Sequence, residues 1–257
     1  MKISQKDMDF QFLNMNDKTK IDEILSSIQD RDKIYIDIGC SNICNLPNKF
    51  IKESHKTLFF DIDSTKCSNW SNSENFKIIN KKVTPKNVNE LIFSNISDAS
   101  DITFLDIDID GYDFYVLEAL LKKSRPYLIM AEINEKIPPP IKFSVKYDDN
   151  YFWDSSHFYG MSLSKFNELA DKYGYDLIEL TANNIYALRT DKNKNFNKYS
   201  AEEIYLKNYK RPRLSNLLRD FNYNSNVDFL LNLSVDECVK EINVYFAKYS
   251  GRYELYL

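Results

Sequence analysis

Carboxylate side chains are concentrated in one short segment of this 257-residue chain, Asp106-Ile-Asp-Ile-Asp110-Gly111. The segment follows apolar residues 102–105, whose β-branched and aromatic side chains are typical of a buried strand. Because side chains alternate along a strand, Asp106, Asp108 and Asp110 would share one face. Three carboxylates repel one another in a dry core, so we expect them at a polar, ligand-filled strand end or around a cation.

A calcium-binding loop of the EF-hand type is the alternative for these acids. The alternating Asp residues and Gly111 fit the start of such a loop, but the position that needs a bidentate Glu holds Leu117, with Glu118 one residue late. The preceding residues also lack the character of an entering helix. We therefore favour the strand end.

Two further strand ends are acidic. Residues 33–38 alternate and lead into Asp37-Ile-Gly39, and the apolar residues 58–60 are followed by Asp61-Ile-Asp63. Ligands of open parallel sheets bind outside the carboxyl ends of the strands, where an acid after the second strand can accept hydrogen bonds from ribose hydroxyls. A single glycine does not make the three-glycine turn of a dinucleotide site. An ordinary turn at Gly39 and a solvated carboxylate at Asp61 are the alternatives.

A fourth strand end carries Glu132, followed by Asn134, within the apolar run 127–133. Together with Asp108 and Asp110, these side chains could supply oxygen ligands to Mg²⁺ or Ca²⁺. We favour instead that the acids orient an acceptor or bind an ammonium group of a cofactor.

One of the two histidines lies in a setting that suits catalysis. His157 belongs to the aromatic loop Trp153-Asp-Ser-Ser-His-Phe-Tyr-Gly160, and the ordinary pKa of histidine suits a general base. A surface loop histidine is the alternative. His55 lies in a charged stretch and is expected to be solvated.

Apolar spacing along the chain predicts strands that alternate with helices. We expect helices over residues 17–29, 84–93, 113–123 and 163–173, and strands over residues 33–38, 58–63, 76–79, 102–109, 127–133, 175–180 and 185–189. This order indicates βαβ units and a mainly parallel sheet, with the last two strands paired as an antiparallel hairpin. Residues 138–160 are expected to form a long loop over the site.

Composition and charge limit the classes to which the chain can belong. With 43% hydrophobic residues, 28% charged residues and a net charge of −4, it is typical of a globular protein and atypical of a nucleic-acid binder. Its apolar runs are too short for a membrane span, and no secretory signal peptide is visible. Four cysteines without a CxxC pair favour reduced thiols and a cytoplasmic location.

A polar stretch over residues 190–198 is expected to divide the chain. We predict a sheet domain with an N-terminal helix over residues 1–195 and a small helical appendage over residues 196–257. Ser234 and Glu237 predict a capping box at the start of a helix in this appendage. Arg211 and Arg213 could clamp a phosphate there, or belong to a solvated helix end.

The ordered motifs DIGCSN, FDID, VTPKNV, FLDIDIDGYD and PYLIMAEIN resemble the class I methyltransferases that depend on S-adenosylmethionine (SAM), and among them the FkbM-type group. Asp108, Asp110, Gly111 and Glu132 match that group's fourth and fifth strands. The resemblance covers residues 33–190 and implies a Rossmann-like, seven-stranded, mostly parallel sheet whose last strand is antiparallel. The single glycine of the first turn departs from the family. The residues that the resemblance implies for the cofactor are Asp37, Gly39 and Ser41 for the methionine part, Asp61 for the ribose, Asp63, Val83 and Thr84 near the adenine, and Asp106.

The resemblance implies an O-methyltransferase for a small polar acceptor, such as a sugar or a phosphate- or phosphoramidate-type group in surface-polysaccharide tailoring. His157 would take the acceptor's proton, with Asp108 or Glu132 positioning it. The side chains expected to bind the acceptor are Asp110, Asn134, Tyr159, Arg211 and Arg213. The alternatives are an NAD-dependent or nucleotide-sugar oxidoreductase and a non-catalytic, methyltransferase-like subunit that binds a partner. No nucleic-acid or membrane partner is expected.

Overall fold

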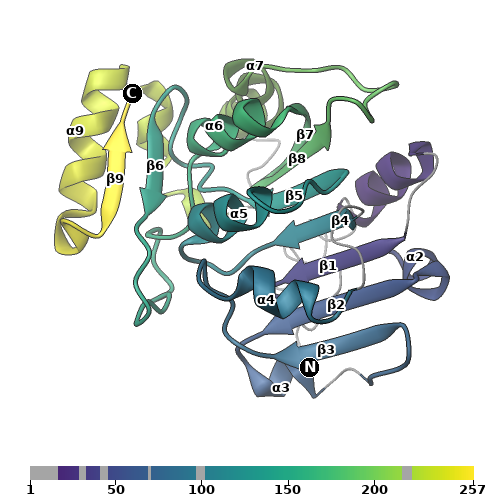
Figure 1. Cartoon of the computed structure of the whole chain (residues 1–257). Helices are drawn as coiled ribbons and strands as arrows, with labels where there is room; N and C mark the ends of the chain where they lie inside the picture. Colours follow the sequence, from purple (N-terminus) through teal and green to yellow (C-terminus); the bar gives the residue numbers. More distant parts are fainter. Residues whose placement is uncertain (1–16, 29–32, 41–45, 69–70, 97–101, 216–221) are drawn as a thin grey trace, which may run out of the picture.

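Seven strands form one sheet through the middle of the molecule in the computed structural model (Figure 1). The structure describes residues 17–28, 33–40, 46–68, 71–96, 102–215 and 222–257. The strands are β1 (Ile34–Ile38), β2 (Lys56–Asp61), β3 (Phe76–Asn80), β4 (Ile102–Ile107), β5 (Leu128–Glu132), β7 (Tyr175–Thr181) and β8 (Asn184–Arg189). Their order across the sheet is β3-β2-β1-β4-β5-β8-β7.

Strand direction confirms the predicted fold class. β1 pairs in parallel with β2 and β4, and the pairs β2–β3 and β4–β5 are also parallel. β8 runs antiparallel to both β5 and β7, so the last strand of the sheet in sequence is the reversed one. The chain builds β2 and β3 on one side of β1 and continues with β4 and β5 on the other. The ligand crevice of such a sheet lies at the carboxyl ends of the strands, at this switch in order.

Helices cover both faces of the sheet, because strand residues alternate between two apolar clusters. Ile36 belongs to the cluster that includes α4 (Val88–Phe93), α5 (Asp113–Leu121) and α6 (Leu163–Tyr173), which lie in front of the sheet in Figure 1. Tyr35 belongs to the other cluster, with the helix over residues 17–27 and α2 (Asn48–Glu53). Asp37 follows Tyr35 by two positions, so its carboxyl is on this second face.

Helix ends follow the capping signals of the sequence, with one exception. α6 begins after Ser162, whose side chain accepts a hydrogen bond from the Lys165 backbone, and ends at Gly174 with a left-handed φ of 75°. α4 begins at Val88, later than predicted. The reason is that the Asn87 side-chain oxygen accepts a hydrogen bond from the Thr84 backbone N–H (2.7 Å), and the residues between them form a turn.

Residues 138–160 are not the structureless loop that we expected. They contain β6 (Lys142–Val145), which pairs antiparallel with β9 (Tyr253–Tyr256) in a second, two-stranded sheet. Figure 1 shows this small sheet beside the main one, next to α9 (Val235–Tyr245). A strand partner more than a hundred positions away leaves no local signal in the sequence.

The C-terminal segment is mainly helical, as predicted, and its apolar residues join the core of the sheet. It includes α7 (Ala201–Tyr205), α8 (Arg211–Leu214) and α9, and the Ser234–Glu237 capping box is confirmed. Buried Tyr209, Ile242 and Phe246 belong to the same apolar cluster as Ile36, so the core continues beyond residue 195. In the described ranges, no helix is long and apolar enough to cross a membrane.

Candidate active site

Carboxylates from neighbouring strands meet at the carboxyl ends of β1, β4 and β5. Asp37 pairs in register with Asp106, and Asp108, just beyond β4, donates its backbone N–H to the end of β1 (2.9 Å). One carboxylate oxygen from each of Asp108, Asp110 and Glu132 lies within 4.8 Å of the other two. Asp108 is exposed, Asp110 is half-buried and Glu132 is buried. Asp108, Asp110 and Glu132 therefore form one cluster in space, whereas Asp106 is buried within β4.

Gly39 allows β1 and β4 to approach each other at this cluster. A Cβ at this position would lie 1.6 Å from the Asp108 carbonyl oxygen, and φ is +94°, a conformation that L side chains rarely adopt. The Gly39 N–H donates to the Phe60 carbonyl (2.8 Å), which ties the turn to β2 as well. Its predicted contact with a cofactor stays a prediction. Ser41 lies outside the described residues.

The backbone that carries Asp110 is held by a side chain that sequence analysis missed. The buried Asp113 carboxylate accepts hydrogen bonds from the Ile109 and Gly111 backbone N–H groups (2.9 Å each). Asp110 has a φ of +53°, and its carbonyl accepts a hydrogen bond from the Tyr151 hydroxyl (3.1 Å). This clamp fixes the acidic loop before any ligand binds. An Asp in the first turn of the following helix was the available signal.

Burial and mutual repulsion raise the pKa values of these carboxyls. Burial first, and then the charges of Asp108 and Asp61, raise the pKa of Asp37 to about 8. Loss of solvation and neighbouring acids raise the pKa of Asp110 to about 6. The same causes hold the pKa of Glu132 well above its usual range. Such a site binds a proton or a cation, and its carboxyls can exchange a proton with a ligand near neutral pH.

Glu132 and Asn134 lie on the β5 side of the cluster. Glu132 Oε1 accepts a hydrogen bond from Asn183 Nδ2 (2.6 Å), whereas Oε2 has no partner within the described part of the chain. Asn134 Nδ2 donates to the carbonyls of His157 (2.8 Å) and Tyr159 (3.0 Å). Asn134 therefore ties the aromatic loop to the end of β5, a structural role beside its predicted contact with an acceptor.

The β2 end carries the residues expected to hold the nucleoside. Asp61 Oδ1 accepts the Asp63 backbone N–H (2.7 Å), and Asp61 Oδ2 lies 3.6 Å from Lys66 Nζ. Asp63 caps α3 (Ser64–Cys67) by accepting the Thr65 backbone N–H (2.8 Å). Asp61 is buried at the end of β2, and its contact with a ribose stays a prediction, while the side chain of Asp63 is engaged in capping.

The loop expected near the adenine lies beside the acidic loop. The Val83 carbonyl accepts a hydrogen bond from the Tyr112 hydroxyl (3.2 Å), and both residues are buried. Thr84 is also largely buried. This bond fixes the loop after β3 to the segment that follows β4. The contacts of Val83 and Thr84 with an adenine stay predictions.

His157 is not held by the acids that we expected to position it. Its Nε2 is 2.9 Å from Asn226 Oδ1, and the Asn226 amide donates to Tyr245 (3.1 Å), so Nε2 carries the proton. Neither Asp108 nor Glu132 is its partner, because the C-terminal segment supplies a nearer one. Burial lowers the pKa of His157. Its Nδ1 has no partner among the described residues, so a base role for it stays a prediction.

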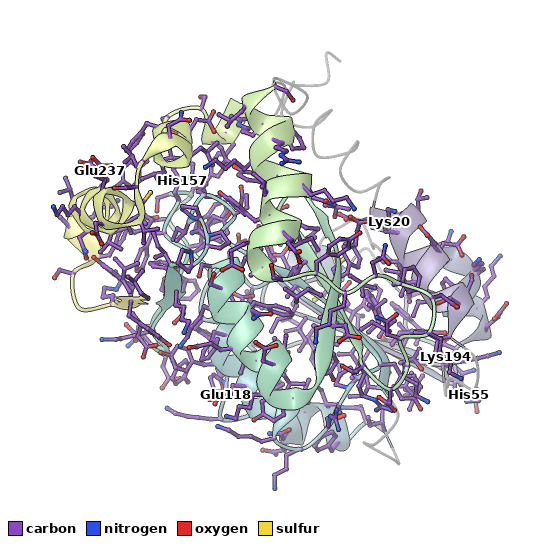
Figure 2. The ribbon with its side chains drawn as sticks, turned by 90° about the horizontal axis from the view of Figure 1, so that it is seen from above. Lys20, His55, Glu118, His157, Lys194 and Glu237 are labelled. Carbon is purple, nitrogen blue, oxygen red and sulfur yellow. The ribbon has the colours of Figure 1, made fainter. Side chains whose placement is uncertain are left out.

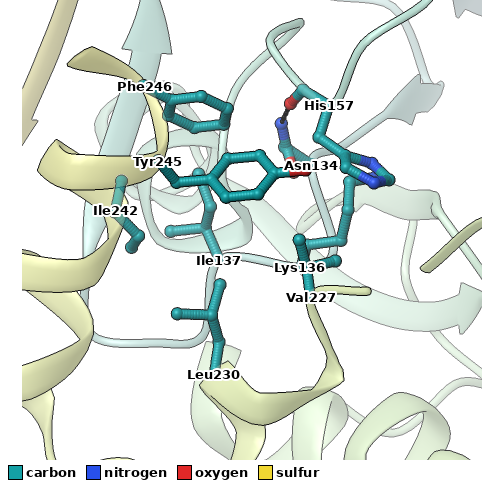
Figure 3. Close-up of a pocket in the computed structure, with 9 residues that line it drawn as sticks. All are labelled: Asn134, Lys136, Ile137, His157, Val227, Leu230, Ile242, Tyr245 and Phe246. Atoms are coloured by element: carbon teal, nitrogen blue, oxygen red, sulfur yellow. Dashed lines mark hydrogen bonds between the residues drawn. The ribbon is translucent and has the colours of Figure 1, made fainter. Parts of the chain in front are cut away.

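The side chains around His157 are closely packed. Figure 2 places His157 beside the helix that carries Glu237, on the opposite side of the view from His55, which is exposed as predicted. The cavity next to it has a volume of about 10 Å³ and is shown in Figure 3. Its lining residues are Asn134, Lys136, Ile137, His157, Val227, Leu230, Ile242, Tyr245 and Phe246. This volume holds one water molecule at most, so neither a sugar nor a cofactor fits there.

A buried ion pair that sequence analysis missed follows β5 directly. Lys136 Nζ lies 3.1 and 3.2 Å from the two Glu135 carboxylate oxygens, and both side chains are almost fully buried. Tyr159 donates to Glu135 (3.2 Å) and contacts Lys136, and the Asn224 amide also donates to Glu135. Tyr159, predicted to line an acceptor pocket, is thus a member of this network. An adjacent Glu-Lys pair within an apolar stretch was the available signal.

Arg213, which we expected to clamp a phosphate, has a carboxylate partner within the C-terminal segment. Its guanidinium is largely buried and binds Asp228 through two hydrogen bonds of 2.8 Å. A buried guanidinium needs an internal carboxylate, and this bidentate pair occupies the groups that would bind phosphate. Arg211 is exposed on α8 and does not form a clamp with Arg213.

Comparison with known proteins identifies the architecture. The family model of the methyltransferase FkbM domain matches residues 14–177. No curated protein matches the chain in sequence. Among solved structures, magnesium protoporphyrin IX methyltransferase (ChlM) from Synechocystis PCC 6803, with bound SAH, is 7% identical and has a TM-score of 0.48, over 74% of this chain and 89% of its own. TrmK from M. capricolum, in complex with S-adenosyl-homocysteine, is 14% identical with a TM-score of 0.40, over 88% and 97%.

Proposed function

This chain belongs to the methyltransferase FkbM family, and from that premise we propose that it transfers a methyl group from SAM to a hydroxyl of a small, neutral polar acceptor such as a sugar. SAM supplies an activated methyl group and a neutral leaving group. The protein must align the acceptor oxygen with the methyl carbon and accept the hydroxyl proton as the carbon–oxygen bond forms. The family match supports a methyltransferase over an oxidoreductase. A non-catalytic, methyltransferase-like subunit that binds a partner is the alternative that the activity test below separates.

The first two strand ends suit the cofactor. Asp61 would accept hydrogen bonds from the ribose hydroxyls, since its carboxylate lies at the end of β2 with one oxygen only loosely paired to Lys66. Asp37, buried at the end of β1, would face the positively charged methionine part. Val83 and Thr84 would border the adenine. The protein thus places carboxylates where SAM carries its positive charge and its ribose hydroxyls.

The last two strand ends suit a hydroxyl-bearing acceptor. Asp108 and Glu132 are hydrogen-bond acceptors that could orient a hydroxyl and take its proton, and Asp110 adds a third oxygen within reach. A cluster of carboxylates repels a phosphate, and Arg213 is already bound to Asp228. These two facts favour a neutral sugar over a phosphate-bearing acceptor. The pathway, surface-polysaccharide tailoring, is proposed from the family resemblance.

One observation carries this proposal: three carboxylates lie within 4.8 Å of one another at the switch in strand order of a methyltransferase sheet. The test is methyl transfer from tritiated SAM to a panel of neutral sugars and the matching sugar phosphates. We expect labelled product from a neutral sugar with the full chain and none with Asp108→Asn. Preference for the phosphates would overturn the acceptor class, and absence of SAM binding in calorimetry would overturn the proposal itself.

A further inference from the structure

The distances within the acidic cluster suit a shared metal ion. One oxygen from each of Asp108, Asp110 and Glu132 lies within 4.8 Å of the others. Two oxygens on opposite sides of a Ca²⁺ ion are about 4.6–5.2 Å apart, and two on opposite sides of Mg²⁺ are about 4.0–4.2 Å apart. The exposed side of Asp108 leaves room for water or a hydroxyl to complete the coordination.

The Glu132 side chain supplies an independent indication of a ligand. Glu132 is only 9% exposed, and its Oε2 has no hydrogen-bond partner among the described residues. Asn183 holds Oε1 at 2.6 Å and thereby fixes the carboxylate. A Glu132 carboxylate oxygen lies within 4.8 Å of a carboxylate oxygen of Asp108 and of one of Asp110. Two facing carboxylates need a proton or a cation between them.

The two lysines described near the cluster are bound to other acids. Lys66 is paired with Asp61 at 3.6 Å, and Lys136 is paired with Glu135 at 3.1 Å. Within the described ranges, no salt bridge reaches the three acids of the cluster. Among the described residues, no cation is therefore paired with this negative charge, which leaves protons or a bound ion to balance it.

We propose that Asp108, Asp110 and Glu132 bind one divalent cation of the Mg²⁺, Ca²⁺ or Mn²⁺ type. The ligand set consists of carboxylate oxygens alone, which suits these hard ions and not Zn²⁺ or copper. The ion would bind without SAM, since its ligands come from β4, β5 and the loop after β4. In the proposed reaction it would lower the pKa of an acceptor hydroxyl that it coordinates.

The test is a titration of the full chain with Mn²⁺, followed by the electron paramagnetic resonance signal of free Mn²⁺, without SAM. We expect one tight ion per chain that Mg²⁺ or Ca²⁺ displaces. Glu132→Gln keeps the side-chain volume and an oxygen for Asn183 but removes the charge, so Mn²⁺ affinity should fall by roughly tenfold or more. Asp110→Asn, at a half-buried position, should lower Mn²⁺ affinity to a similar extent. This second variant tests the site if Glu132→Gln does not fold. Asp149→Asn, an exposed acid paired with Lys86, is the matched control and should bind as the wild type does.

Three results would overturn the cation site. They are no bound Mn²⁺ in the wild-type chain, equal affinity in the Glu132 or Asp110 variant, and stoichiometric release of Mn²⁺ by SAM. The last result would assign the acids to the cofactor's ammonium group. SAM binding measured by calorimetry in the absence of metal tests the methyltransferase proposal separately, so a failure of one is not a failure of the other.

Discussion

Glu132 and Glu135 are three residues apart, both nearly excluded from solvent, and yet their surroundings are opposite. Glu135 is bound by Lys136, Tyr159 and Asn224, so its charge and both oxygens are compensated within the chain. Glu132 has Oε1 bound by Asn183 and Oε2 without a partner among the described residues, and its carboxylate has an oxygen within 4.8 Å of two further acids. The comparison teaches that burial alone does not distinguish a structural carboxylate from a functional one. The distinction lies in whether the protein itself supplies the partners.

The largest expected effect is on the compensated side of this comparison. Lys136→Met leaves Glu135 buried without its cation, which should lower the free energy of unfolding by about 3–5 kcal/mol. Urea denaturation measures this change. The double variant Glu135→Gln/Lys136→Met should regain most of the loss, because no uncompensated charge remains. A single variant within about 1 kcal/mol of the wild type would mean that the ion pair does not stabilise the fold.

On the uncompensated side, the expected effect is on turnover. Asp108→Asn keeps the shape of an exposed side chain but removes a proton acceptor, so kcat should fall by roughly 10²–10⁴-fold. Stability should be unchanged or slightly higher, since one of several repelling charges is gone. Single-turnover kinetics with saturating SAM provide the measurement. Near-normal kcat would remove Asp108 from the acceptor site.

The cofactor side of the cluster is tested by Asp61. Asp61→Ala should weaken SAM binding by about 1.5–3 kcal/mol, the scale of hydrogen bonds to a charged group, and Asp61→Asn by less. Isothermal calorimetry measures both. Asp149→Asn, an exposed acid paired with Lys86, is the control and should leave SAM affinity intact. Unchanged affinity in Asp61→Ala would make the ribose assignment wrong and Asp63 the candidate.

Repulsion within the cluster should also appear in the pH dependence of stability. Asp37 has its pKa raised from 3.8 to about 8 in the folded chain, so between these values the folded state holds a proton that the unfolded state has lost. Its contribution to stability therefore falls as pH rises through that range. Asp37→Asn should flatten the decline, as seen in urea unfolding at several pH values. An equally steep decline in the variant would show that other groups cause it.

The smallest effect is expected at His157, which lies on the packed side of the molecule. Its Nε2 is bound to Asn226 and the adjacent cavity holds at most one water molecule, so His157→Gln should reduce kcat less than about tenfold. Steady-state kinetics of this variant and of Asp108→Asn show which of the two substitutions lowers kcat more. A loss equal to that of Asp108→Asn would restore His157 as the base.

The sheet and its acidic strand ends were predictable because they rest on local patterns. Alternation in residues 33–38 and 102–109 indicated strands, and the period of two placed Asp106 and Asp108 on one face. The pairing of β6 with β9 was not predictable, since it joins segments far apart in sequence. The same holds for Arg213 with Asp228 and for His157 with Asn226, where a tertiary partner takes a side chain that looked available.

The clamp of Asp113 on the acidic loop has a kinetic consequence. Both backbone amides that flank Asp110 are bound to one buried carboxylate, so the loop is already in its left-handed conformation before a ligand arrives. This loop does not have to become ordered during association, so we expect no slow isomerisation of it before or after the encounter. The observed association rate should then rise in proportion to ligand concentration without a plateau, and differences in affinity among ligands arise from how fast they leave.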